Sequence, residues 1–468
     1  MRVTERLTGR PGLISTFFDL GEHGYTADEY FVSGTAARYE HAGPVEADGL
    51  WTAREAGEAP YTTRIVVYRP ADPAAFDGTV VVEWLNTSSG ADTPAVWLTA
   101  HRHLLRSGHA WVGVSAQADG IHGGSLFASR SGAFKSITLP PLKDSDPERY
   151  AALAHPGNPH SYAIFTALGA LLRERVTAEA LGLPGVRTLL AAGQSQSAAC
   201  LVTHLNAVAP LHPVYDGYFL HGRPGLPSGL TTGSRLEPEQ VPARVRTDGR
   251  APILIVQSET DVFGLLDAVR SRQPHDGRLR VWEIAGAAHA DTYTLSASFR
   301  DSGTLAPADL AALLAPTDTP LGTQLPAPIN SGPQQHYVAQ AALASLLRWT
   351  TDGIPPGSPM PLGTLRAPDG TLSLRTDDDG IARGGVRTPW VDSPISLLTG
   401  LPHTRDIGPA LLFGATHPLP GLPTRYPGGL PDYLAHFESA ALRSLEDGFL
   451  LEPDYTEAIA LAEAAYPR

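Results

Sequence analysis

The sequence predicts an α/β fold in which a mostly parallel sheet is covered by helices on both faces. Apolar runs of strand length, rich in β-branched residues, alternate with longer helical runs through the middle of the chain. Strands of this kind are typical of parallel sheets that are buried on both sides. The 468 residues, 42% of them hydrophobic and 18% charged, suit a soluble globular protein with a large core.

The predicted strands and helices follow one another in the order typical of βαβ units. Runs such as TVVVEWL and PILIVQ have strand length, and the predicted strands are 62–68, 79–85, 110–116, 186–192, 217–221, 252–257 and 279–284. In the first helical run, Trp97, Leu98, Leu104 and Leu105 provide the apolar anchors. The predicted helices are 95–106, 161–173, 198–209, 262–270 and 335–349.

Composition divides the chain into a core and two flanking regions. Residues 1–60 contain alternating aromatic pieces such as EYFVSGTAARYE and predict a β-rich N-terminal extension. Residues 61–350 are the predicted core. Residues 351–468 are rich in Pro and Gly, with helical runs near their end, and predict a C-terminal extension packed on that core. The core carries predicted insertions at 118–160 and 222–250, since long loops in α/β proteins usually form lids or pocket walls.

The net charge and the cysteine content limit the classes of function that the protein can have. The net charge of −13 argues against nucleic-acid binding and against binding to anionic membranes. The N-terminus lacks the apolar run of a signal peptide, and no stretch approaches the ~18 apolar residues that span a bilayer. A cytoplasmic protein is therefore expected. The single cysteine, Cys200, excludes an intramolecular disulfide and is expected to be a buried core residue.

A sharp turn is expected where the predicted strand 186–192 meets the next helix. The residues Gly193-Gln194-Ser195-Gln196-Ser197 match G-x-S-x-G, the nucleophile elbow of α/β hydrolases, except that Ser197 replaces the second glycine. Small residues are needed on both sides of the nucleophile because the strand and the helix pass close together there. Ser195 is the predicted nucleophile. Ser197 is the alternative, although it would lie half a turn into the helix.

A serine nucleophile needs a base that takes its proton and an acid that orients the base. In this fold the chain order is Ser, then acid, then His. The strand PILIVQ runs into SETDV, where Asp261 is the predicted acid and Glu259 is the alternative. The next strand, LRVWEI, leads through small residues to His289, the predicted general base.

The tetrahedral intermediate also needs donors for its oxyanion. One predicted donor is the backbone N–H of Gln196, directly after the nucleophile. The second is predicted in the loop after TVVVEWL, at the N–H of Asn86 or Thr87. This chemistry needs no metal and no organic cofactor. A dinucleotide site would need G-x-G-x-x-G after a strand, and the elbow lacks its second glycine.

The sequence resembles the poorly characterised "alpha/beta hydrolase domain-containing" serine hydrolases. The resemblance extends over most of the chain and implies an α/β-hydrolase core with a Ser–acid–His triad. The motifs that carry it are GYTADEYFVSGTAARY, VVEWLN, HPGNPHSYAIF, AAGQSQSA, QSETDV, WEIAGAAHAD, PINSG and GGVRTPWVD.

The sequence therefore predicts a serine esterase that cleaves a small-molecule carboxylic ester through an acyl-enzyme. The alternatives are a lactonase or acyltransferase with the same triad, and a degenerate homologue that only binds a ligand. Trp84, Phe127, Phe165 and Phe263 are the candidate pocket residues, and an apolar pocket favours neutral esters. The stretch 223–250 is the predicted lid, with 118–160 as the alternative.

Overall fold

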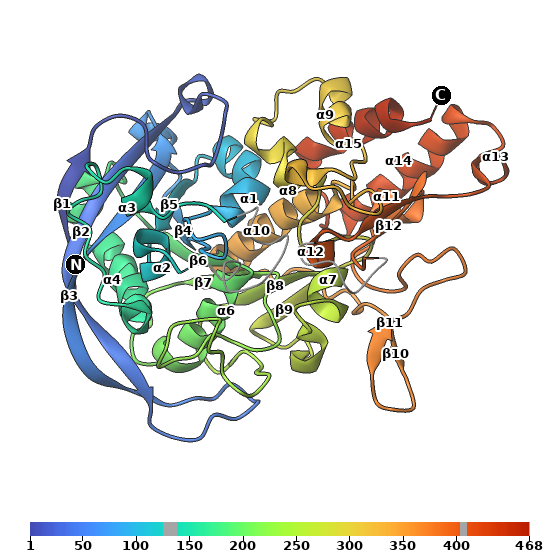
Figure 1. The fold of residues 1–468 in the computed structure, drawn as a ribbon. Helices are drawn as coiled ribbons and strands as arrows, with labels where there is room; N and C mark the ends of the chain where they lie inside the picture. Colours follow the sequence, from blue (N-terminus) through green and yellow to red (C-terminus); the bar gives the residue numbers. More distant parts are fainter. Residues whose placement is uncertain (125–137, 403–409, 468) are drawn as a thin grey trace.

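A nine-stranded sheet runs through the molecule in the order β1-β2-β3-β5-β4-β6-β7-β8-β9 (Figure 1). The computed structural model describes residues 1–124, 138–402 and 410–467. The strands are β1 Arg2–Leu7, β2 Tyr25–His41, β3 Ala53–Pro70, β4 Thr79–Trp84, β5 Ala110–Val114, β6 Thr188–Gln194, β7 Gly217–His221, β8 Ile253–Ser258 and β9 Leu279–Ile284. From β5 to β9 all neighbouring strands are parallel, so the predicted α/β class is confirmed.

The helices are short on average and a few long ones cover the sheet. They are α1 Ala95–Arg106, α2 Ala118–His122, α3 Leu142–Ser145, α4 Ser161–Arg173, α5 Arg175–Ala180, α6 Gln196–Thr203, α7 Glu259–Phe263, α8 Thr292–Leu295, α9 Pro307–Leu313, α10 Gln334–Asp352, α11 Pro389–Asp392, α12 Ala410–Phe413, α13 Leu422–Arg425, α14 Leu430–Glu446 and α15 Glu452–Ala465. In the described part of the chain, no helix combines the length and the apolar character that crossing a membrane requires.

Alternating strand residues face two separate cores, one on each side of the sheet. Val80 and Val82 of β4 belong to the core that α4 and α6 cover. Val81, between them, belongs to the core that α1 and α10 cover. This alternation follows from the strand period of two residues, and burial on both faces explains why these strands are apolar throughout. Cys200 of α6 is fully buried in the first of these cores.

The N-terminal strands continue the central sheet. β2 and β3 form a long antiparallel hairpin along one side of the molecule, and β3 pairs antiparallel with β5 (Figure 1). The expected boundary at residue 60 falls inside β3, and that at residue 350 falls inside α10. Neither position is a break in the fold.

A buried ion cluster joins this hairpin to the loop that follows β4. The Arg64 guanidinium on β3 is fully buried and lies 3.1 Å from Glu29 Oε1 and 2.7 Å from Asp92 Oδ2. Arg149, from the segment 138–160, pairs with the other oxygen of Glu29. Since Asp92 belongs to the loop between β4 and α1, the hairpin holds the loop that contains Asn86 and Thr87.

The same loop is held at its far end by a buried carboxylate. Glu83 on β4 accepts hydrogen bonds from the first-turn amides of α1, Val96 N at 2.8 Å and Trp97 N at 2.9 Å, and from Trp111 Nε1 at 2.8 Å. Burial raises the pKa of Glu83 to about 7. These donors, at the positive end of the helix dipole, fix the start of α1 relative to β4.

Most predicted elements agree with the structure, and one predicted helix is wrong. α1 and α4 have the predicted bounds. The predicted helix 262–270 is absent: α7 begins three positions earlier, at Glu259, where Ser258 caps it, and it ends before Gly264. Only a single 3-10 turn, 268–271, follows. Gly264 and the loop after it interrupt the apolar run that suggested a longer helix.

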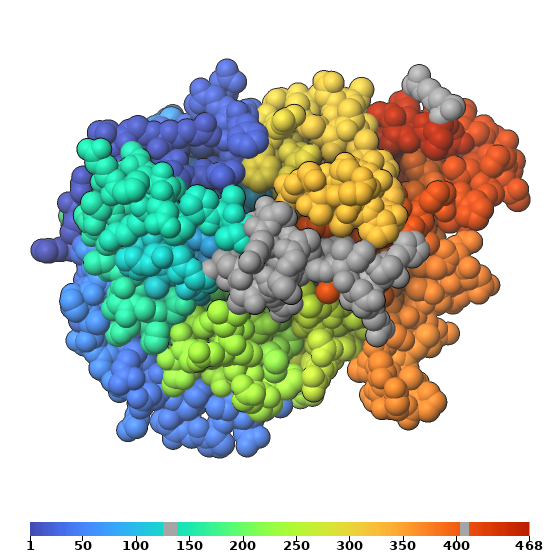
Figure 2. All heavy atoms as spheres, viewed as in Figure 1, coloured from blue at the N-terminus to red at the C-terminus, as the bar shows by residue number. Residues whose placement is uncertain are grey.

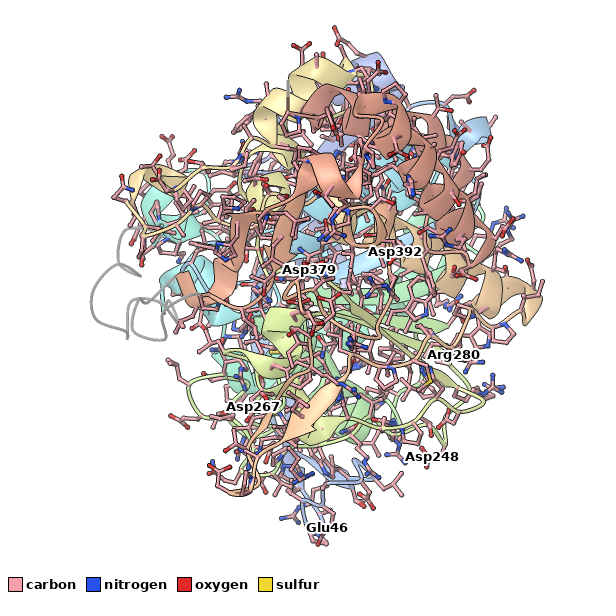
Figure 3. All side chains as sticks on the ribbon, turned by 90° about the vertical axis from the view of Figure 1, so that its right-hand side faces the viewer. Glu46, Asp248, Asp267, Arg280, Asp379 and Asp392 are labelled. Carbon is pink, nitrogen blue, oxygen red and sulfur yellow. The ribbon has the colours of Figure 1, made fainter. Side chains whose placement is uncertain are left out.

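The C-terminal extension packs on the core through helices and a further ion cluster. α14 and α15 lie together on the side opposite the N-terminal hairpin (Figure 1). Arg102 of α1 is buried and lies 3.0 Å from Asp301 Oδ2 and 2.7 Å from Glu457 Oε1 of α15. Figure 3 faces this side and shows Asp379 and Asp392, which pair with Arg425 and Arg387 within the extension.

Candidate active site

The turn between β6 and α6 has the strained backbone of a nucleophile elbow. Ser195 occupies it with φ 59° and ψ −114°, a conformation that non-glycine residues rarely adopt. A Cβ at Gly193 would lie 2.9 Å from Leu201 Cδ1 and 3.1 Å from the backbone carbon of Ser197, so a larger residue there would displace its neighbours. Strain of this kind persists where surrounding structure fixes it and is concentrated at functional sites.

Ser195 and Ser197 have different surroundings. Ser195 is partly exposed, and no residue that the structure describes hydrogen-bonds to its Oγ. Ser197 is fully buried, and its Oγ donates to Gln194 O at 2.9 Å while accepting from Gln194 N at 3.0 Å. The second serine of the elbow therefore closes the turn, and only the first faces open space.

The predicted acid and base lie together at the carboxyl ends of β8 and β9. His289 Nδ1 is 2.6 Å from Asp261 Oδ1, and Ser258 N donates to Asp261 Oδ2 at 2.6 Å. Burial opposes the ionisation of Asp261, but the attraction and hydrogen bond of His289 outweigh it and lower the pKa of this carboxyl. A Cβ at Gly222 would lie 3.2 Å from the imidazole, so the end of β7 packs directly on the pair.

Glu259, the alternative acid, makes other contacts. Its carboxylate accepts from Gly286 N at 2.6 Å, from Gly400 N at 2.8 Å and from Thr399 Oγ1 at 3.1 Å. Burial raises its pKa to about 7. The side chain therefore connects the loop before His289 to the C-terminal extension.

Ser195 and His289 line the same pocket, of about 250 Å³. Gln194, the residue directly before Ser195, has its Nε2 3.2 Å from His289 Nε2. Since His289 Nδ1 bears the proton that bonds to Asp261, its Nε2 carries the lone pair and accepts from the Gln194 amide. This glutamine was missed by sequence reasoning, although its position next to the nucleophile was a usable signal.

Two further polar side chains, also missed, line the pocket. His221 is buried at the end of β7, and burial lowers its pKa to about 4, so the imidazole is neutral. Gln335, at the start of α10, is equally buried. Neither His221 Nδ1 nor Gln335 Oε1 has a hydrogen-bond partner among the described residues.

The candidate oxyanion donors lie on two neighbouring segments. Gln196 is the first residue of α6. The N–H of Thr87 is directed to Gln196 Oε1 at 3.3 Å, a long bond. The N–H of Asn86 donates to Thr93 O at 3.0 Å, and the side chain of Asn86 donates to Gln194 O at 2.9 Å. Both backbone donors are engaged, but Thr87 makes the longer bond, and its acceptor is a side chain that can turn away, whereas the acceptor of Asn86 is a backbone carbonyl.

The apolar walls of the pocket are mostly aliphatic, and Trp84, Phe165 and Phe263 do not line it as predicted. Trp84 and Phe165 pack on each other at a tilt inside the core, and the Phe263 ring lies against Arg272. Phe127 lies outside the described residues. The apolar lining consists of Ala95, Leu98, Pro224, Leu265, Leu266, Ala290, Leu295, Leu321, Leu412 and Phe413. Trp84, at the end of β4, and Phe165, in α4, are buried core residues instead.

Several loops far apart in sequence contribute these walls. The face in Figure 2 carries atoms of the 220–270 region on one side and of the 290–325 region on the other. Pro224 and Arg235 of the predicted lid 223–250 line the pocket. The described part of 118–160 does not line it. Among the described residues, no three His, Cys, Asp or Glu side chains gather as metal ligands.

The sheet, the elbow and the strand-end residues define the fold as that of an α/β hydrolase. The chain belongs to the family described as "Alpha/beta hydrolase domain", which it matches over residues 2–460. Membership of this family supports hydrolase activity. A search of curated proteins finds none that matches.

Solved structures similar to this chain include esterases and a serine hydrolase. A mutant of the esterase rPPE is 15% identical, with a TM-score of 0.28, over 52% of this chain and 66% of that esterase. A serine hydrolase without a lid from Xanthomonas campestris is 12% identical, with a TM-score of 0.26, over 54% of this chain and 83% of that one. A fungal esterase from Rhizomucor miehei is 11% identical, with a TM-score of 0.29, over 56% and 77%. This chain thus spans just under two thirds of the first of these esterases.

Proposed function

We propose that this hydrolase is a serine esterase, with Ser195 as nucleophile, His289 as general base and Asp261 as the acid that orients it. The observation that carries the proposal is the 2.6 Å contact between His289 and Asp261, with His289 and the strained Ser195 in one pocket. The apolar, mostly aliphatic walls favour a neutral ester of a small molecule.

The proposed reaction proceeds in two steps. Ser195 Oγ attacks the ester carbonyl carbon while His289 Nε2 takes its proton, and the oxyanion is held by the N–H groups of Gln196 and Thr87. The intermediate collapses, the bond to the alcohol oxygen breaks, and His289 returns the proton to that oxygen. Water then attacks the acyl-enzyme, again giving its proton to His289, and the acid leaves as Ser195 is restored.

The resting arrangement adds one requirement to this sequence. The amide of Gln194 occupies the nitrogen that must accept the serine proton, so it has to move away when Ser195 engages His289. A neutral imidazole has a single lone pair at Nε2. Any hydroxyl or amide group that donates a hydrogen bond to this nitrogen therefore competes directly with the Ser195 hydroxyl.

Substitution of each elbow serine tests the nucleophile. Ser195→Ala is expected to lower kcat on p-nitrophenyl acetate by at least ~10³-fold, since the attacking oxygen is removed. Ser197→Ala is the matched control. It removes a buried hydroxyl that hydrogen-bonds to the Gln194 backbone, and it should retain measurable turnover. Thermal unfolding of both variants checks that they are folded. Near-normal turnover in Ser195→Ala would contradict the proposal.

A further inference from the structure

One wall of the catalytic pocket comes from the C-terminal extension. Leu412 and Phe413 of α12 line the pocket with Ser195, more than two hundred residues away in sequence. Both are buried, with exposed fractions of 8% and 5%. They form one apolar cluster with Leu325 and Ile329 as further buried members and with Leu265, Ala290 and Leu295 packed against it.

This wall is bonded directly to the loop of the general base. Ala290, the residue after His289, donates its N–H to Leu412 O at 3.0 Å. Asn330 N donates to Phe413 O at 2.9 Å. Backbone bonds on both residues leave them little freedom, so the two side chains form a fixed part of the pocket wall, held to the loop that carries His289.

The adjoining hairpin is packed closely on the same loops. It consists of β12 Ser396–Thr399 and β13 Ala415–Pro418. A Cβ at Gly400 would lie 2.2 Å from Ala287 O, and one at Gly414 would lie 2.2 Å from Thr399 O. Glu259 adds its hydrogen bonds to Gly400 N and Thr399 Oγ1. The extension is therefore positioned by the acid and base loops themselves.

The chemistry decides which part of an ester meets this wall. His289 must protonate the leaving alcohol oxygen, so that oxygen has to lie beside the imidazole. The carbon chain attached to it extends along whatever surface surrounds the base. The acyl carbonyl, in contrast, is directed to the donors Gln196 and Thr87 on α6 and the loop after β4.

We infer that Leu412 and Phe413 determine which alcohol portion of an ester the enzyme accepts, and that the C-terminal extension is the element that sets this specificity. The inference rests on the proposed esterase activity. It assigns an aliphatic alcohol of limited bulk as the leaving group, because Leu412 and Phe413 give the pocket an apolar, fixed wall that is bonded to the His289 loop.

Changing the size of Phe413 tests this assignment. Phe413→Ala should raise the ratio of kcat/KM for cyclohexyl acetate over ethyl acetate by about 10-fold or more, because the pocket gains the volume of a ring. Phe413→Trp should lower the same ratio. Neither variant should change the ratio of p-nitrophenyl butyrate to p-nitrophenyl acetate by more than about twofold, since the alcohol is constant in that pair.

Leu98→Ala is the matched control, because it truncates a buried side chain in the same pocket from α1. It should leave the cyclohexyl-to-ethyl ratio within about twofold. Three results would overturn the inference. The first is a shift of the cyclohexyl-to-ethyl ratio in Leu98→Ala as large as that in Phe413→Ala. The others are an unchanged cyclohexyl-to-ethyl ratio in both Phe413 variants and a shift of the butyrate-to-acetate ratio instead. The same preparations are also assayed with p-nitrophenyl acetate. If the esterase proposal itself fails, the wild-type protein hydrolyses none of the esters, and this result differs from all three outcomes above.

Discussion

At the scale of single residues, Gln194 contacts the proposed general base directly. Its amide donates to His289 Nε2, the nitrogen that the serine needs. A donor at this position stabilises the neutral imidazole, whereas an acceptor would stabilise the protonated form. The identity of residue 194 should therefore set the pH range in which the base is active.

Gln194→Glu is expected to move the acidic limb of the kcat/KM profile to higher pH by about one unit or more, because a carboxylate there favours the imidazolium. Gln194→Met, of similar length and without a donor, should move the limb in the same direction by less. Initial rates on p-nitrophenyl acetate between pH 5 and pH 9 give both profiles. Identical limbs in all three proteins would show that Gln194 does not act on the base.

The two carboxylates of the SETDV turn should respond differently to neutral substitution. Asp261→Asn is expected to lower kcat by as much as ~10⁴-fold, because an amide stabilises the wrong imidazole tautomer. Glu259→Gln should keep most of kcat and lower the free energy of unfolding by about 1–3 kcal/mol, since its amide group cannot accept from all three donors. The reverse pattern in kcat would assign the acid to Glu259.

The pH dependence of stability gives a second readout for Glu259. Its pKa of about 7 in the folded protein is above the ~4.3 of an unfolded chain, so the folded state binds the proton more tightly. This stabilisation is complete below about pH 4.3 and is lost as the pH rises through about 7. The stability of the wild-type protein relative to Glu259→Gln should therefore fall between pH 5 and pH 8, as measured by urea unfolding.

At the scale of elements, the strands and the longer helices could be predicted because their apolar residues follow a regular pattern along the sequence. β7 and β9 have the predicted bounds, as do α1 and α4, because continuous apolar runs and helical spacing leave a direct pattern in the sequence. The run 262–270 was not predictable in this way. Its apolar residues include Leu265 and Leu266, which line the pocket from a loop. The residues of a pocket wall follow no regular spacing in the sequence.

The candidate site likewise has one part that the sequence could predict and one part that it could not. Ser195, Asp261 and His289 follow strands in a fixed chain order, so the elbow motif and this order are sufficient to predict them as candidates. Leu412 and Phe413 come from a Pro- and Gly-rich region, and nothing local indicates which distant loop they contact. The pairing of Ala290 with Leu412 is a tertiary contact between positions 122 residues apart, and a single sequence carries no pattern for it.

At the scale of the whole molecule, the buried arginine Arg102 joins three distant parts of the chain. It connects α1 to Asp301 and to Glu457 of α15. Arg102→Met is expected to lower the free energy of unfolding by about 3–5 kcal/mol, because Asp301 stays buried without its counter-charge. Arg175→Met, which breaks the exposed pair with Glu179, is the control and should cost less than about 1 kcal/mol. Equal losses in urea unfolding would contradict this role.

The central claim, that Ser195 is an activated nucleophile, is tested most directly by covalent labelling with a fluorophosphonate followed by peptide mass spectrometry. An activated serine reacts because a base takes its proton, whereas an ordinary hydroxyl does not. The predicted result is a single adduct on Ser195, absent in Ser195→Ala and formed far more slowly in a His289→Ala variant. An adduct on Ser197, or no adduct on the folded wild-type protein, would contradict the account.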